Sequence, residues 1–110
     1  MTEFLYDSSG QWIAYRVNER WVWNSDGEWI GWCPWTDEPN HVVTVEGDYL
    51  GHILGDRLLR RIYQPYRGYP GYPGYPGYPG YPGYPGFAGY LPLPPGTMDV
   101  PEDLLAPSGS

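Results

Sequence analysis

DSSGQWIAY, residues 7–15, contains a turn and the strand that follows it, and the chain carries this pattern three times. The repeated part reads GQWIAY (10–15), GEWIGW (27–32) and GDYLGH (47–52). The shared order is glycine, a polar residue, Trp or Tyr, Ile or Leu, Ala or Gly, and then a ring. A partial fourth copy is DRLLRRIY (56–63). Units this short cannot bury an apolar face alone, so we expect them to pack around one shared centre.

Each copy has the composition of a β-hairpin. The segments DSSG (7–10) and NSDG (24–27) begin with Asp or Asn and end with Gly, which predicts a type I turn closing on a glycine with positive φ. Trp, Tyr, Val and Ile on both sides favour strands, and no twelve-residue window has a helical apolar stripe. The third copy, HVVTVEGD (41–48), lacks the leading Asp or Asn, so we expect its turn to differ most.

The strand after the first turn predicts how side chains are divided between the two faces. Simple alternation places Trp12 and Ala14 on one face and Ile13 and Tyr15 on the other. A small residue recurs at the position of Ala14 in every copy, which indicates close approach of neighbouring backbones or of a ring packed over it. We expect the hairpins to form a small, shallow all-β barrel with an aromatic interior and hidden sheet edges.

The tandem strand, D-x-x-G turn and W-I-G strand, followed by YLGHILGDRLLRR (49–61), resembles the bacterial four-fold beta-flower domain over residues 4–62. In that family, short hairpin petals form a shallow barrel with pseudo-four-fold symmetry. The resemblance implies a fold and carries no established activity.

Composition changes sharply after the hairpins and predicts three regions: a Trp-rich barrel (1–63), a Gly-Tyr-Pro arm (64–90) and a Pro-rich acidic tail (91–110). The arm contains six GYP triplets, residues 68–85. Proline at every third position favours polyproline II, which at ~3.1 Å per residue would span roughly 55 Å. A disordered tail, a collagen-like triple helix and tyrosine-driven association, either between copies or with the tryptophans of the barrel, are the alternatives.

Charge and cysteine content restrict the class of partner. The net charge is −7 with no lysine, which disfavours nucleic acids and anionic membranes as partners. The single cysteine, Cys33, excludes an intrachain disulfide and a cysteine-based zinc site. There is no signal-like start, and no apolar run approaches the ~20 residues of a membrane span. We therefore expect a cytoplasmic protein without a transmembrane segment.

Catalytic residues are not expected. His52 occupies the ring position of the repeat, which predicts a structural role. A nucleophile made of Cys33 with a histidine lacks a recognisable oxyanion hole nearby. Asp37, Glu38 and His41 could hold a metal, but such groupings are common by chance in a loop. We predict a protein with no catalytic residue, metal or cofactor.

Six tryptophans between residues 12 and 35 exceed what a core of this size hides readily. We expect about four to fill the interior and the others, Trp35 above all, to be exposed. The predicted binding residues are Trp21, Trp23, Trp35, Tyr72, Tyr75 and Tyr78. They suggest a non-enzymatic interaction or assembly module that binds a protein, or itself as a homo-oligomer, through the arm. The alternative is a sensor barrel that binds a small ligand and carries a passive tail.

Overall fold

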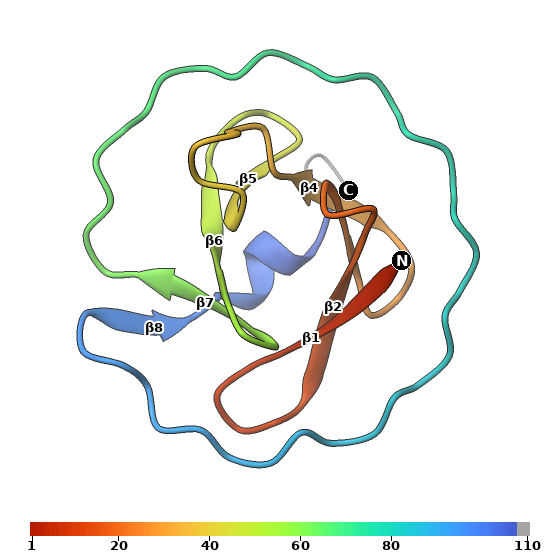
Figure 1. Cartoon of the computed structure of the whole chain (residues 1–110), viewed down its shortest axis with the longest axis vertical. Coiled ribbons are helices and arrows are strands. Elements are labelled where there is room, and N and C mark those ends of the chain that lie inside the picture. The colour runs from red at the N-terminus through yellow and green to blue at the C-terminus, as the bar shows by residue number, and fades with distance from the viewer. Residues whose placement is uncertain (108–110) are drawn as a thin grey trace.

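Eight strands follow one another along the chain, and the first seven close into a barrel (Figure 1). The computed structural model describes residues 1–107. Strands adjacent in the chain pair antiparallel, and a parallel contact between Tyr6 and Arg57 joins β1 to β7. The elements are β1 (Thr2–Tyr6), β2 (Trp12–Val17), β3 (Trp21–Asn24), β4 (Trp29–Trp32), β5 (His41–Thr44), β6 (Tyr49–Leu54), β7 (Arg57–Arg61), β8 (Thr97–Asp99) and a 3-10 helix, η1 (Glu102–Leu105). The predicted all-β barrel of hairpins is confirmed.

The three repeated turns share one geometry, which confirms the predicted positive φ. Gly10, Gly27 and Gly47 have φ of +92°, +83° and +96°. In each turn the glycine N–H donates to the carbonyl three residues earlier, at 2.9–3.1 Å. A register shift, typical of a β-bulge, accompanies each hairpin.

The third turn does not depart from the other two, contrary to expectation. In the first turn the Asp7 carboxylate accepts the N–H of Gln11 at 3.0 Å. In the third, the Thr44 hydroxyl accepts the N–H of Asp48, also at 3.0 Å. Threonine supplies the same acceptor at the same position, so the turn needs neither Asp nor Asn.

The interior of the barrel is aliphatic, and the predicted aromatic interior is wrong. The buried cluster consists of Leu5, Ala14, Val22, Ile30, Cys33, Val42, Leu50, Ile53, Leu58 and Val100. The small positions leave no room for a side chain, because a Cβ at Gly31 would meet the Val43 carbonyl oxygen and one at Gly51 would lie 2.6 Å from the Leu59 carbonyl oxygen. This confirms the predicted close approach of backbones at the small positions.

The rings lie on the other side of the sheet. A second cluster contains Tyr6, Trp12, Tyr15 and Trp23, with Phe4, Val17, Trp21 and Trp29 packed against it. In β2, the register shift leaves Ile13 without a partner on β1. Trp12, which precedes the unpaired residue, therefore points to the opposite face from the one that simple alternation gives. Trp12 and Tyr15 share a face instead of lying on opposite faces as predicted.

A fourth hairpin is completed from a distant part of the sequence. Strand β8 pairs antiparallel with β7, and residues 62–96 connect the two. We call residues 62–96 the belt. Val100 enters the interior, and η1 packs against it through Leu104 and Leu105. The predicted tail (91–110) therefore contributes a strand and core contacts, while its residues 108–110 lie outside the described part of the chain.

The belt encircles the barrel (Figure 1). Its base is held by the Ile62 N–H, which donates to the Gly96 carbonyl at 2.8 Å. The molecule measures 35 × 33 × 27 Å, too short for a straight arm of roughly 55 Å. Polyproline II needs φ near −75° throughout, whereas each glycine from Gly68 to Gly89 has φ between +85° and +100°. A positive φ at every third residue bends the chain, so the continuous polyproline II arm is a wrong prediction and the triple helix does not describe this conformation either.

Candidate functional site

Three tryptophans each contact two successive tyrosines of the belt. The ring centroids lie 5.6–6.0 Å apart and the ring planes are tilted or perpendicular, the favourable arrangement for aromatic pairs. The pairs are Trp29 with Tyr72 and Tyr75, Trp23 with Tyr75 and Tyr78, and Trp12 with Tyr81 and Tyr84. The belt therefore covers the aromatic side of the first two hairpins.

The belt also passes over the glycine of every repeated turn. A Cβ would meet the Tyr69 ring at Gly47 (2.7 Å), the Tyr78 hydroxyl at Gly27 (3.1 Å) and the backbone of Gly89 at Gly10 (2.5 Å). Each glycine is therefore required for two reasons, because it allows the positive φ of the turn and leaves room for the belt. Tyr69 and Tyr78 are three triplets apart, so three triplets span the distance between the second and third hairpins.

Arg67 fixes the start of the belt. Its guanidinium donates twice to Asp37 at 2.9 and 3.0 Å and once to Glu38 at 2.9 Å. Its Cζ lies 4.7 Å from the centroid of the Trp35 ring. The loop before β5 thus binds the belt by paired hydrogen bonds and a cation–π contact.

Arg57 fixes the end of the belt. This buried side chain donates to the carbonyls of Gly89 at 2.8 Å, Ala88 at 3.3 Å and Asp7 at 3.0 Å. The Ala88 N–H in turn donates to the Gly10 carbonyl at 2.9 Å. One arginine therefore joins the first turn, the fourth hairpin and the belt.

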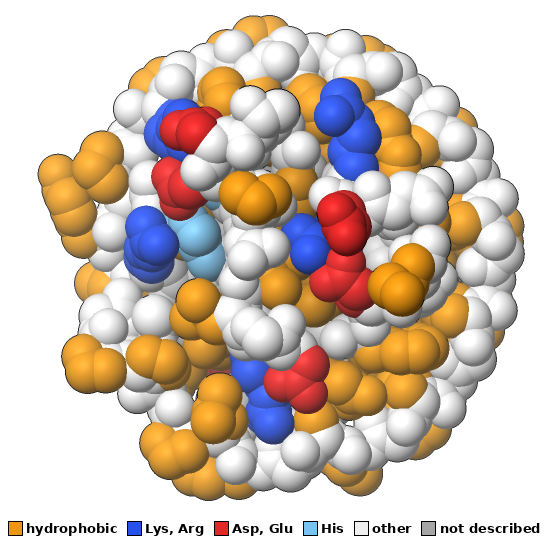
Figure 2. Space-filling model, in the orientation of Figure 1, with side chains coloured by type: hydrophobic (Ala, Val, Ile, Leu, Met, Phe, Trp, Pro, Cys, Tyr) orange, Lys and Arg blue, Asp and Glu red, His pale blue; other side chains and the backbone are white. Residues whose placement is uncertain are grey.

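The outward side of the belt remains open to solvent. The tyrosines from Tyr69 to Tyr84 are 54–63 % exposed, although each belongs to a segment seated on the barrel. The sequence from Gly68 to Met98 has no charged residue. In Figure 2 the charged side chains of this face gather inside the rim, and the rim itself is apolar or neutral. From Gly68 onward the belt is therefore an uncharged aromatic rim around an acidic protein.

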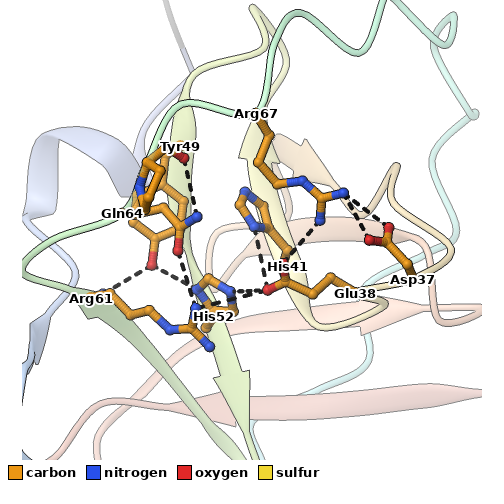
Figure 3. Close-up of polar contacts among 9 residues, drawn as sticks. Asp37, Glu38, His41, Tyr49, His52, Arg61, Gln64 and Arg67 are labelled. Carbon is orange, nitrogen blue, oxygen red and sulfur yellow. Dashed lines mark hydrogen bonds and ion pairs between the residues drawn. The ribbon is translucent and has the colours of Figure 1, made fainter.

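A histidine cluster lies on the third hairpin (Figure 3). His52 occupies the ring position of the repeat that Tyr15 and Trp32 occupy in the first two hairpins. His41 on β5 and His52 on β6 are register partners with ring centroids 4.7 Å apart. Both point toward Glu38, whose Oε2 lies 2.9 Å from His52 Nε2 and 3.8 Å from His41 Nδ1. Tyr49 Oη lies 2.7 Å from His52 Nδ1 and accepts the Arg61 N–H.

Burial keeps both histidines neutral near pH 7. It lowers the pKa of His41 to about 4, with a further contribution from His52. Burial also lowers the pKa of His52, although its hydrogen bond to Glu38 opposes the shift. That same hydrogen bond lowers the pKa of Glu38. The cluster therefore combines two neutral imidazoles with one carboxylate, and these three residues could hold a metal ion.

The predicted binding residues divide into two groups. Trp21, Trp23, Tyr72, Tyr75 and Tyr78 belong to the aromatic layer and the belt, while Trp35 lies apart under Arg67. Trp23 is 1 % exposed and Trp35 is half-buried, so the expected exposure of Trp35 is not met. The binding role of all six stays a prediction. Tyr72, Tyr75 and Tyr78 offer their outward sides to a partner.

Sequence reasoning did not single out Arg57 or Arg67 as residues that hold the belt, nor Tyr49 as a partner of His52. It also missed β8. A signal for β8 was present in the sequence, because Gly96 is followed by a polar residue and a large apolar one, as in the repeated turns. The structure gives Gly96 a φ of +79°, as it gives the turn glycines a positive φ.

A scan against protein-family models and searches of curated proteins and solved structures each find no match to this chain. The resemblance to the beta-flower domain therefore stays a prediction. Within residues 1–107, no helix has the length and hydropathy that a bilayer crossing requires.

Proposed function

We propose that the protein is a non-enzymatic interaction or assembly module whose binding surface is the outward side of the belt. The observation that carries the proposal is that successive tyrosines are 54–63 % exposed in a segment free of charge. Monomeric soluble proteins rarely expose a continuous apolar surface of this kind unless it meets a partner.

The rim suits a partner of matching chemistry. Tyrosine rings provide large, rigid contact area, and proline and glycine leave those rings accessible. The flanking side chains Tyr63, Tyr66, Phe87 and Tyr90 are 75–80 % exposed and extend the rim at both ends. A second copy of the chain offers the same uncharged rings, so side-by-side association of barrels is the form of assembly that we expect.

The alternative of a small-ligand sensor receives less support. The tryptophans that would bind a flat ligand lie under the belt, and such a ligand would first have to displace it.

Self-association tests the proposal. The full chain is compared with a variant in which Tyr63, Tyr66, Phe87 and Tyr90 become serine. We expect the solution mass of the unaltered chain to rise with concentration, and that rise to be lost in the variant without a change in thermal midpoint. A Leu54→Ser variant is the control, because Leu54 is 40 % exposed outside the belt. A monomeric mass for the unaltered chain at all concentrations, or equal association in the variant, would contradict the rim as an assembly surface.

A further inference from the structure

We propose that Glu38, His41 and His52 form a binding site for a divalent transition-metal ion, with zinc as the best-suited metal. One ligand atom from each residue lies within 4.8 Å of the other two. Glu38 Oε2 lies 3.8 Å from His41 Nδ1 and 2.9 Å from His52 Nε2. In a tetrahedral zinc site with bonds of 2.0–2.2 Å, ligand atoms are separated by about 3.3 Å. To reach that separation, the 2.9 Å between Glu38 Oε2 and His52 Nε2 must lengthen slightly and the 3.8 Å between Glu38 Oε2 and His41 Nδ1 must shorten slightly. No pair of ligand atoms needs to close by more than about 1.5 Å.

The unused nitrogen of His41 is an independent indication of a ligand. His41 is 2 % exposed, and among the described residues its Nδ1 has no hydrogen-bond partner. A buried polar atom without a partner is destabilising unless something binds it. This nitrogen points to the Glu38 carboxylate at 3.8 Å, too far for a hydrogen bond and suitable for a shared ion.

The neighbours of the three ligands have the arrangement of a metal site. Tyr49 Oη contacts the ring nitrogen of His52 that faces away from Glu38, at 2.7 Å. Such outer contacts fix the tautomer and orientation of a ligating histidine. Arg67 donates to Oε1 of Glu38 at 2.9 Å and leaves Oε2 directed at the histidines. When an ion binds, the proton of His52 moves from Nε2 to Nδ1, where the Tyr49 hydroxyl oxygen accepts it in a hydrogen bond, and Nε2 presents its lone pair to the ion.

The site is accessible from solvent. A cavity of about 230 Å³ adjoins it, lined by Glu38, His41, His52, Ile53, Leu54 and Arg61, among others. Three protein ligands leave a fourth position for water or for an anion entering through this cavity. Two arginines beside Glu38 oppose a cation: Arg67, which donates to Oε1 at 2.9 Å, and Arg61, whose Nη1 lies 3.9 Å from Oε2. The half-exposed side chain of Arg61 can turn toward solvent.

Titration of the full chain with Zn²⁺, followed by calorimetry, tests the site. We expect one ion per chain, and at least about tenfold weaker binding in Glu38→Gln and in His52→Gln. Glu28→Gln is the matched control, because it removes the same charge from a different, acidic cavity. Arg61→Gln should bind Zn²⁺ several-fold more tightly, a gain that a purely structural role for the cluster would not produce.

A second measurement applies if a variant fails to fold. In the unaltered chain, the ¹⁵N signals of His41 Nδ1 and His52 Nε2 should shift together when Zn²⁺ is added. The inference would be overturned by the absence of saturable binding, by binding that survives both ligand substitutions, by loss of binding only in Glu28→Gln, or by unshifted histidine signals at saturating Zn²⁺.

Discussion

Replacing Gly10 by alanine should detach the end of the belt, and the structure allows the effect to be estimated. Gly10 has φ +92°, and an added Cβ would lie 2.5 Å from the backbone N and O of Gly89. Backbone cannot yield as a flexible side chain can, so the belt must move away. That movement breaks the Ala88 to Gly10 and Leu91 to Ser8 backbone hydrogen bonds, and the bond from Arg57 to Gly89.

The magnitude follows from the bonds lost. A neutral hydrogen bond contributes about 1 kcal/mol and one to a charged group about 1.5–3 kcal/mol. Since released groups regain water at the surface, we expect a net loss of about 2–4 kcal/mol beyond the backbone strain of alanine at positive φ, itself about 1–2 kcal/mol. Gly96→Ala isolates that strain, because Gly96 has φ +79° and no atom within 4 Å of the added Cβ.

Urea unfolding followed by tryptophan fluorescence measures the difference between the two variants. Chymotrypsin cleavage after Phe87 and Tyr90, which flank Gly89 and are not followed by proline, reports detachment. Gly10→Ala should unfold at lower urea and be cut faster than Gly96→Ala. Equal stability and equal cleavage of the two variants would refute the contact between the belt and the first turn.

Three further predictions concern separate parts of the molecule. Tyr75→Ala should lower the free energy of unfolding by about 1–3 kcal/mol, because the Tyr75 ring contacts two tryptophans. Tyr66→Ala is the control and should change the urea midpoint little, because the Tyr66 side chain is 78 % exposed. Equal urea midpoints for the two variants would contradict the ring contacts of Tyr75. Folding lowers the pKa of His41 from 6.5 to about 4, so the unfolded chain binds a proton at a higher pH than the folded chain does. The contribution of His41 to the free energy of unfolding is therefore complete above pH 6.5 and is lost as the pH falls toward 4. The free energy of unfolding, measured with urea, should be about 2–3 kcal/mol lower at pH 4.5 than at pH 7.5, with a smaller difference in His41→Gln, and a pH-independent free energy would contradict the assignment. Burial raises the pKa of the Cys33 thiol, so Cys33 should react with a thiol reagent only when the chain unfolds; rapid modification of the native protein would show that the thiol is accessible.

The local chemistry of the sequence predicts the hairpins well. DSSG, NSDG and the flanking β-branched and aromatic residues specify turns and strands within a few positions of one another. The recurring small residue also predicts close backbones, as Gly31 and Gly51 confirm. Such features depend on neighbours in sequence and need no knowledge of the tertiary fold.

The division between inside and outside is harder to predict, because a one-residue bulge reverses it. Alternation places Trp12 with Ala14, but the unpaired Ile13 transfers Trp12 to the opposite face. The hydrophobic pattern does not distinguish the inner from the outer face of the barrel either. The outer face carries apolar tryptophans because the belt covers it, so both faces are apolar in sequence.

The belt and the histidine cluster depend on contacts across long separations in sequence. Arg57 reaches Gly89 and Arg67 reaches Asp37, and neither pairing leaves a local pattern. Likewise, Glu38 and His41 are close in the chain, whereas His52 joins them only through the register of β5 with β6. The residue types were visible in the sequence, but their convergence was not.

The central claim is that the Gly-Tyr-Pro repeat lies on the tryptophans of its own barrel. Nuclear Overhauser effects between indole and tyrosine ring protons test this claim most directly, measured on the full chain at a concentration where the protein is monomeric. We predict cross-peaks from Trp12 to Tyr81 and Tyr84, whose ring centroids lie 5.8 and 5.9 Å away, and their loss when those tyrosines become alanine. Tyrosine signals at random-coil positions with no indole cross-peak would contradict the account.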